Sequence, residues 1–258
     1  FQGNPVIIKE TNTPSTIPMI QREHDFLMSP PIGPIDANLT DYGIPLDWKV
    51  RTRFVQLINK AITPEMYKRG TIVLEKAQGK ALSRESTTDQ SLPFKFHFGA
   101  LMGYVDMMRQ LAKKNVALDS NIDTDLFVMP DMQNRRLDVV RIDCMPSIGG
   151  ANEPSAMQSP EYWRKANRGG RNLNYEQLAV DQVIELTNML YPKSNPTWNF
   201  LGNMIPALSG RFKEADINSA DTLFDRMKGG LVRANWNDDF VKNGDDSGLK
   251  KWVGGQFT

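Results

Sequence analysis

The clearest pattern of apolar and polar positions in the chain lies at residues 93–115. Apolar side chains recur there every three or four positions, the spacing that places them on one face of a helix: Phe94, Phe98, Leu101, Met102, Val105, Met108 and Leu111. The pattern predicts a long helix at the centre of the hydrophobic core. Gly99 and Gly103, four residues apart, would let a second helix cross this one closely.

Other segments also carry helical signals. Residues 45–62 begin with Asp47 as a candidate N-cap and place six apolar side chains near one face: Trp48, Val50, Phe54, Leu57, Ile58 and Ala61. Thr63-Pro64-Glu65 and Ser159-Pro160-Glu161 each combine a capping residue, a first-turn proline and a first-turn acid, which is typical of a helix start. Asn174 is expected to cap another helix, and its apolar stripe consists of Leu178, Val183, Ile184, Leu186 and Leu190. A further segment starts at Asn195-Pro196, and residues 216–228 predict one more short helix.

One part of the chain favours strands. Two short β-like runs, at residues 126–129 and 137–143, flank a turn that contains Gln133 and Asn134, and they predict a hairpin. Pro130 would suit the edge of a sheet, because proline has no N–H to donate. Residues 83–92 show no apolar period and are expected to form an exposed loop.

The N-terminal residues 4–45 predict an extended arm. They hold seven of the sixteen prolines, and such a density of proline argues against a helix. The arm is nevertheless rich in apolar side chains, among them Val6, Ile7, Ile8 and Phe26, so we expect it to lie on its own core or on a neighbouring subunit. The polar, glycine-rich residues 229–258 carry scattered aromatic side chains and predict a second docking arm.

Together these patterns predict a mainly α fold, with a helical core, one small β-hairpin and extended N- and C-terminal arms. Residues 1–3, Phe-Gln-Gly, look like the remnant of an engineered protease site. We expect residues 4–45 to be the arm, residues 46–228 the core domain and residues 229–258 the tail.

Composition narrows the classes of function. With 40% hydrophobic and 24% charged residues the chain resembles an ordinary globular protein, and its net charge of +1 excludes a polybasic protein without excluding local basic patches. The single cysteine, Cys144, excludes an internal disulfide framework and is expected to be a small apolar filler at a strand end. The sequence contains no run of about 18 apolar residues, so it predicts no membrane span.

Catalytic motifs are absent from the sequence. There is no phosphate-binding or dinucleotide-binding glycine loop, no H-E-x-x-H and no G-x-S-x-G. Of the two histidines, His97 lies between two phenylalanines and is expected to be buried, and His24 falls in the arm. We therefore expect no enzyme and no cofactor.

Acidic clusters offer an alternative. Asp238, Asp239, Asp245 and Asp246 do not have the spacing of a calcium-binding EF-hand loop. Four carboxylates flank the hairpin and could converge on a divalent metal, as carboxylate nucleases require: Asp123, Asp125, Asp131 and Asp143.

Two basic stretches are candidates for a nucleic-acid interface. The first holds Lys49, Arg51 and Arg53 with no acid between them. The second combines aromatic side chains, on which bases could stack, with cations for phosphates: Tyr162, Trp163, Arg164, Lys165, Arg168 and Arg171. Gly169-Gly170 would allow a close approach of the backbone. The alternative is that Trp163 packs inward and the cations solvate the end of a helix.

These features favour a self-assembling structural protein of the coat or nucleocapsid type. It would contact other copies of itself through the 4–45 arm and bind single-stranded RNA or DNA along a basic groove, in a virion or the cytoplasm. The likeness to such subunits is one of architecture only. Two alternatives remain open: a non-enzymatic interaction module of a secretion machine or phage structure, and a metal-dependent enzyme that uses the carboxylates near the hairpin.

Overall fold

The computed structural model describes residues 5–82, 92–118, 126–144, 146–147, 175–190, 217, 219–234 and 236. Its centre is a five-stranded mixed sheet in the order β2-β3-β8-β7-β5. These strands are β2 (Ile35–Asn38), β3 (Lys49–Phe54), β8 (Arg136–Arg141), β7 (Leu126–Asp131) and β5 (Lys80–Ala81). β3 and β8 run parallel to each other, and every other neighbouring pair in this sheet is antiparallel.

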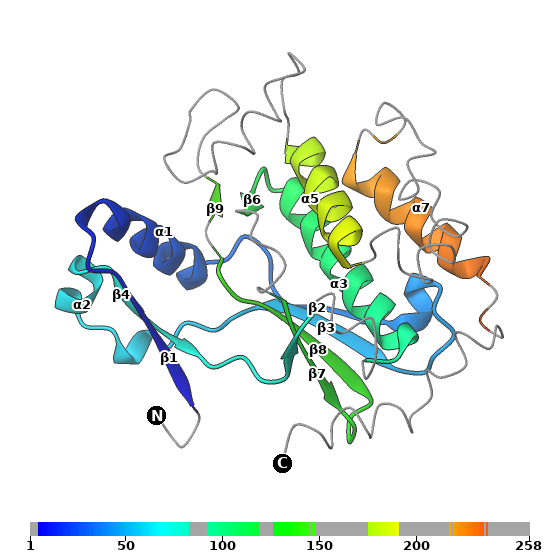
Figure 1. The fold of residues 1–258 in the computed structure, drawn as a ribbon, viewed down its shortest axis with the longest axis horizontal. Helices are drawn as coiled ribbons and strands as arrows, with labels where there is room; N and C mark the ends of the chain where they lie inside the picture. Colours follow the sequence, from blue (N-terminus) through cyan, green and yellow to red (C-terminus); the bar gives the residue numbers. More distant parts are fainter. Residues whose placement is uncertain are drawn as a thin grey trace.

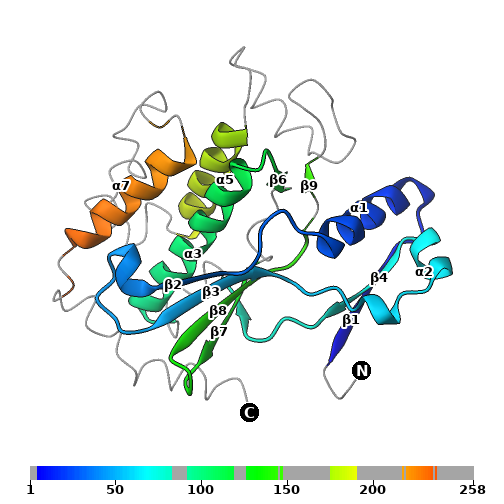
Figure 2. The ribbon, with the colours of Figure 1, turned by 180° about the vertical axis from the view of Figure 1, so that it is seen from behind.

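Three helices cover one face of the sheet (Figures 1 and 2). They are α3 (Phe94–Ala112), α5 (Tyr175–Leu190) and α7 (Ala220–Val232), and α3 lies directly against the strands. A Cβ at Gly103 would overlap the hydroxyl of Thr52 on β3, and a Cβ at Gly99 would lie 2.6 Å from Leu39 Cδ2. The two glycines therefore allow a close approach to the sheet and to the short 3₁₀ helix η2 (Leu39–Tyr42), whereas we predicted a crossing by another helix.

A second, smaller group of elements lies at one end of the molecule, on the left in Figure 1. β1 (Val6–Glu10) pairs antiparallel with β4 (Thr71–Glu75), and α1 (Ile17–Met28) packs beside them with α2 (Pro64–Lys68). The 3₁₀ turns η1 (Pro14–Thr16) and η3 (Asn59–Ala61) connect these elements, and β6 (Ala117–Leu118) pairs with β9 (Pro146–Ser147) near α5.

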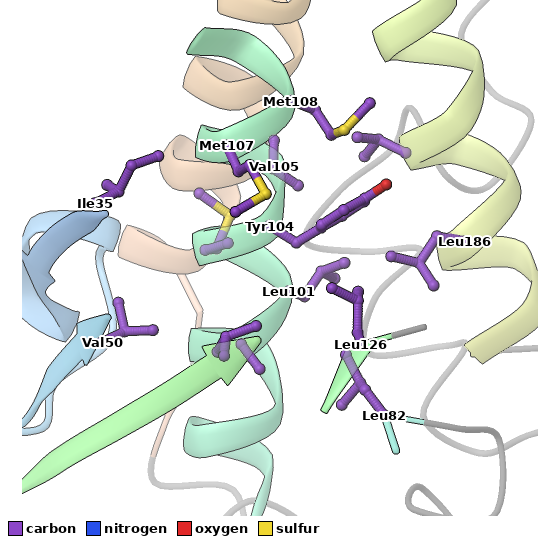
Figure 3. Packing of buried hydrophobic residues seen from close by; sticks show 14 of the residues in the cluster. Ile35, Val50, Leu82, Leu101, Tyr104, Val105, Met107, Met108, Leu126 and Leu186 are labelled. Atoms are coloured by element: carbon purple, nitrogen blue, oxygen red, sulfur yellow. The ribbon is translucent and has the colours of Figure 1, made fainter. Parts of the chain in front are cut away.

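The core fills the space around α3. Figure 3 shows side chains of α3 meeting Ile35 and Val50 from the sheet on one side and Leu186 of α5 on the other. Leu101, Met102, Met107 and Leu111 of α3 are fully buried. The central helix predicted from residues 93–115 is thus confirmed. The helix after Asn174, the helix start at Thr63-Pro64-Glu65 and the hairpin are confirmed as well. The short helix predicted at 216–228 is present and spans Ala220–Val232.

The predicted fold class is wrong, because the chain is an α/β protein with two distinct sheets besides the small β6–β9 pair, and the hairpin is part of the larger one. The main error lies at residues 45–62. Burial there alternates strictly, with Val50, Thr52 and Phe54 inside and Lys49, Arg51 and Arg53 outside, which is the two-residue period of a half-buried strand. These residues form β3 of the sheet instead of a helix.

The prediction of an extended N-terminal arm is also wrong. Residues 17–28 form α1, whose Pro18 lies in the first turn, where a backbone N–H has no helical acceptor to lose. Ile20 and Phe26 of α1 are buried within the chain's own core. In the tail, Trp236 lies beside Phe98, with 6.2 Å between ring centroids. The predictions for residues 1–3, 83–91, 159–174, 195–215 and 237–258 fall outside the described residues.

Candidate functional site

The polar face of the five-stranded sheet carries the first predicted basic stretch. Val50 and Thr52 point toward α3, so Lys49, Arg51 and Arg53 project from the opposite face. Their side chains stand in register with those of the neighbouring strands. Lys49 lies between Asn38 and Arg136, Arg51 between Asp36 and Asp138, and Arg53 beside Val140.

Carboxylates neutralise much of this basic face. Glu75 binds Arg53 with both oxygens, and Asp138 accepts hydrogen bonds from Arg136 Nε at 2.9 Å and Nη2 at 3.2 Å. Arg51 reaches Asp36 only at 3.9 Å, beyond hydrogen-bond distance. Lys49 is exposed and makes no ion pair with any residue that the structure describes. As far as the described residues go, the cations of this face still available to an external anion are Lys49 and, in part, Arg51.

The second predicted basic stretch lies outside the described residues. This applies to Tyr162, Trp163, Arg164, Lys165, Arg168 and Arg171, and likewise to Asp123, Asp125, Asp238, Asp239, Asp245 and Asp246. The structure brings Lys49, Arg51 and Arg53 together on one face of one strand. That this face and the second basic stretch form one binding surface stays a prediction.

The two described carboxylates of the predicted metal site lie apart. Asp131 is at the turn between β7 and β8, where hydrogen bonds from Asn134 lower the pKa of its carboxyl. Asp143 follows the far end of β8 and binds Lys9 at 2.8 Å. Among the described residues no group of three or more histidine, cysteine, aspartate or glutamate side chains could hold a metal ion.

The histidines and the cysteine do not form a catalytic group in the described part of the chain. Burial lowers the pKa of His97 to about 3, so its imidazole is neutral at physiological pH. His24 Nδ1 is 2.9 Å from the Asp25 carboxylate, and its ring lies edge-on to Tyr67. Cys144 is fully buried, as predicted for a filler, and burial raises the pKa of its thiol, which removes the reactive thiolate.

A different surface stands out on the structure, the outer edge of β1, which we call the β1 edge and define by residues 6–10. Five large apolar side chains are exposed in the described part of the chain, and three are consecutive in β1: Val6 at 37%, Ile7 at 43% and Ile8 at 59%. In the described part of the chain, β4 is the only strand that pairs with β1, and the other side of β1 has no strand partner there. An open strand edge with apolar side chains is a template for pairing with another chain.

An ionic cluster holds β1 in place. Lys9 Nζ lies 2.6 Å from Glu23 Oε2 and 2.8 Å from Asp143 Oδ1, and Glu23 Oε1 accepts a hydrogen bond from the Cys144 amide. Burial lowers the pKa of Lys9, but Glu23 and Asp143 more than offset this and leave the pKa raised. The cluster joins β1, α1 and the end of β8, so the β1 edge is presented by an anchored strand.

Sequence reasoning counted Val6, Ile7 and Ile8 among the apolar residues of the arm but did not place them in a strand. The signal was present, because three consecutive β-branched residues bounded by Pro5 and Lys9 favour a short strand.

No protein-family model matches this chain, and no curated protein matches it in sequence. No helix in the described part is long and apolar enough to cross a lipid bilayer. The geometry of the two surfaces is therefore the basis for assigning a function.

Proposed function

We propose that this chain is a structural subunit that assembles with copies of itself through its N-terminal segment. The observation that supports this is the β1 edge, where Val6, Ile7 and Ile8 are exposed on an edge strand while most apolar side chains of the described residues are buried. An edge of this kind is normally shortened, charged or covered in a monomeric protein.

Burial of this edge would be favourable. Fully covering a valine or isoleucine side chain is worth about 1.5–3 kcal/mol, so covering three that are about half exposed would contribute roughly 3 kcal/mol per subunit. New backbone hydrogen bonds would add directionality. The low net charge of +1 keeps the mutual repulsion of packed copies small.

The test is a single substitution in the exposed strand. Ile8→Lys places a charge on a side chain that is 59% exposed, so it should leave the fold intact and disrupt assembly. Met28→Lys is the matched control, because Met28 is 48% exposed at the end of α1 and lies outside β1. We expect light scattering coupled to gel filtration to show concentration-dependent oligomers for the original chain and for Met28→Lys, and monomers for Ile8→Lys.

A chain that stays monomeric up to about 100 μM, where a weak specific association should be visible, would contradict the proposal. So would oligomers that form equally well in Ile8→Lys, since assembly would then use another surface.

Binding of single-stranded nucleic acid is the second candidate function, and Lys49 and Arg51 favour it. They project from the same sheet face at a two-residue spacing, and they are the least neutralised cations of that face in the described residues. A sheet face is a common platform for single strands. The predicted stretch at residues 161–174 would supply the stacking side chains.

The double variant Lys49→Ala/Arg51→Ala tests this candidate. If each cation contacts one phosphate, the salt dependence of oligonucleotide affinity should become shallower by about 1.4 in log–log slope. Lys68→Ala/Arg69→Ala removes the same two residue types from the exposed end of α2 and should change nothing. Fluorescence anisotropy of a labelled oligonucleotide at several salt concentrations measures the salt dependence of affinity for both double variants. Absence of binding by the original chain, or equal slopes for the two variants, would overturn the candidate.

A further inference from the structure

The backbone of β1 presents its hydrogen-bonding groups in a defined order. Lys76 N donates to Pro5 O at 3.1 Å, and Pro5 and Lys76 are the next pair beyond Val6 and Glu75 in the antiparallel register. Hydrogen-bonded pairs alternate along such a ladder. Ile7 and Lys9 therefore direct their N–H and C=O groups toward β4, and Val6, Ile8 and Glu10 direct theirs toward the open edge.

The other side of β4 obeys the same alternation. Ile58 N donates to Val73 O at 2.8 Å and Glu75 N donates to Gln56 O at 2.9 Å, so Val73 and Glu75 bond away from β1. Pro5, which has no N–H, falls at an inward position of β1 and removes no donor from the open edge. The open edge thus offers the groups of three alternate residues, which is what an added antiparallel strand requires.

We propose that the strand added here is β1 of a second copy, paired antiparallel across a twofold axis with Ile8 opposite Ile8 of that copy. This inference rests on the proposed self-assembly and specifies its partner and register. Val6 then faces Glu10 of the second copy, and Glu10 faces Val6. All three outward residues of each strand are used, and each hydrogen-bonded pair exchanges two bonds, which gives about six N–H···O=C bonds.

Charge and side-chain placement favour this register. It sets no two like charges directly opposite, because Ile7 faces Lys9 of the second copy and Glu10 faces Val6. A shift by one hydrogen-bonding step toward the C-terminus would place Lys9 opposite Lys9 and use only two outward residues per strand. The Ile8 side chain, the most exposed of the three, comes to the centre of the contact. The result is a continuous sheet in the order β4-β1-β1-β4, and a twofold contact of this kind is self-complementary.

A charge exchange tests the register. Val6→Glu should set a glutamate opposite Glu10 of the second copy at both ends of the junction and weaken dimerisation about tenfold. Adding Glu10→Lys to the same chain should restore the affinity, because the introduced carboxylate of one copy would then face the introduced ammonium group of the other. Dimerisation constants come from analytical ultracentrifugation, and thermal melting of each variant at high dilution checks that the monomer folds.

A cysteine placed on the axis provides an independent measurement. Opposed residues of a hydrogen-bonded antiparallel pair have Cα atoms about 5.5 Å apart, within the range of a disulfide. Ile8→Cys should therefore give a disulfide-linked dimer on mild oxidation, and Met28→Cys, similarly exposed on α1, should not. The native Cys144 is fully buried and does not interfere.

The outcomes separate the two proposals. A monomeric original chain overturns both. Assembly that ignores the charge exchange and yields no linked Ile8→Cys dimer overturns the twofold β1 junction and leaves the proposed self-assembly in place. Rescue by Glu10→Lys together with linkage at position 8 supports the junction, since no other register brings both pairs of residues together.

Discussion

At the scale of single residues, His97 shows how burial fixes a protonation state. Its imidazole is 2% exposed and lies in the first turn of α3. Desolvation lowers its pKa to about 3, compared with an ordinary value near 6.5. This burial could be predicted from the sequence, because His97 sits between two phenylalanines in a strongly periodic helix.

The consequence is a dependence of stability on pH. As pH falls, a group whose pKa is lowered by folding takes up its proton in the unfolded state before it does so in the folded state. The stability that neutral His97 gives the folded state is therefore complete above about pH 6.5 and is lost as pH falls toward 3. Between pH 6.5 and 5 we expect His97 to reduce the free energy of unfolding by about 2 kcal/mol. Urea denaturation across this range should show the slope, and His97→Gln should flatten it whatever its effect at pH 7. Equal slopes for both proteins would contradict the assignment.

At the scale of elements, the long periodic helices were predictable and the short strands were not. α3 and α5 each repeat the helical period several times, which leaves little room for another interpretation. β3 is six residues long, and Trp48, Val50 and Phe54 fit a helical face as well as a strand when the flanking residues are included. The alternation of Lys49, Arg51 and Arg53 with buried residues was the signal in favour of the strand.

The candidate interface on β3 was likewise only partly predictable from the sequence. The run of cations was visible in the sequence, but as a helix it would have spread them around a cylinder, whereas the strand aligns them on one face. Their neutralisation could not be predicted. Glu75, which binds Arg53, and Asp138, which stands next to Arg51, reach the sheet through long-range pairing. α1 was missed because the density of prolines in residues 4–45 was taken to argue against any helix, although Pro18 lies in the first turn of α1, where proline is well tolerated.

At the scale of the whole molecule, the Lys9–Glu23–Asp143 cluster connects the β1–α1 end of the fold to the five-stranded sheet. Glu23 is fully buried, and both its oxygens are used, one by Lys9 and one by the Cys144 amide. Two segments far apart in sequence, β1 with Lys9 and the end of β8 with Cys144, therefore depend on one carboxylate of α1. Removing the charge of a buried, hydrogen-bonded partner leaves the remaining groups imperfectly solvated, which is costly.

We expect Glu23→Gln to lower the free energy of unfolding by about 3 kcal/mol, because a buried ion pair that loses one partner leaves the other uncompensated. Glu65→Gln, a change of the same chemistry on an exposed side chain of α2, should stay within about 0.5 kcal/mol. Amide hydrogen exchange localises the effect, and protection should fall in β1 and α1 more than in α3. Since the β1 edge is held by the same cluster, Glu23→Gln should also weaken self-assembly. Uniform loss of protection across α3 and β1 would show instead that the two ends of the molecule unfold as one unit, and that the cluster does not set the position of β1 separately.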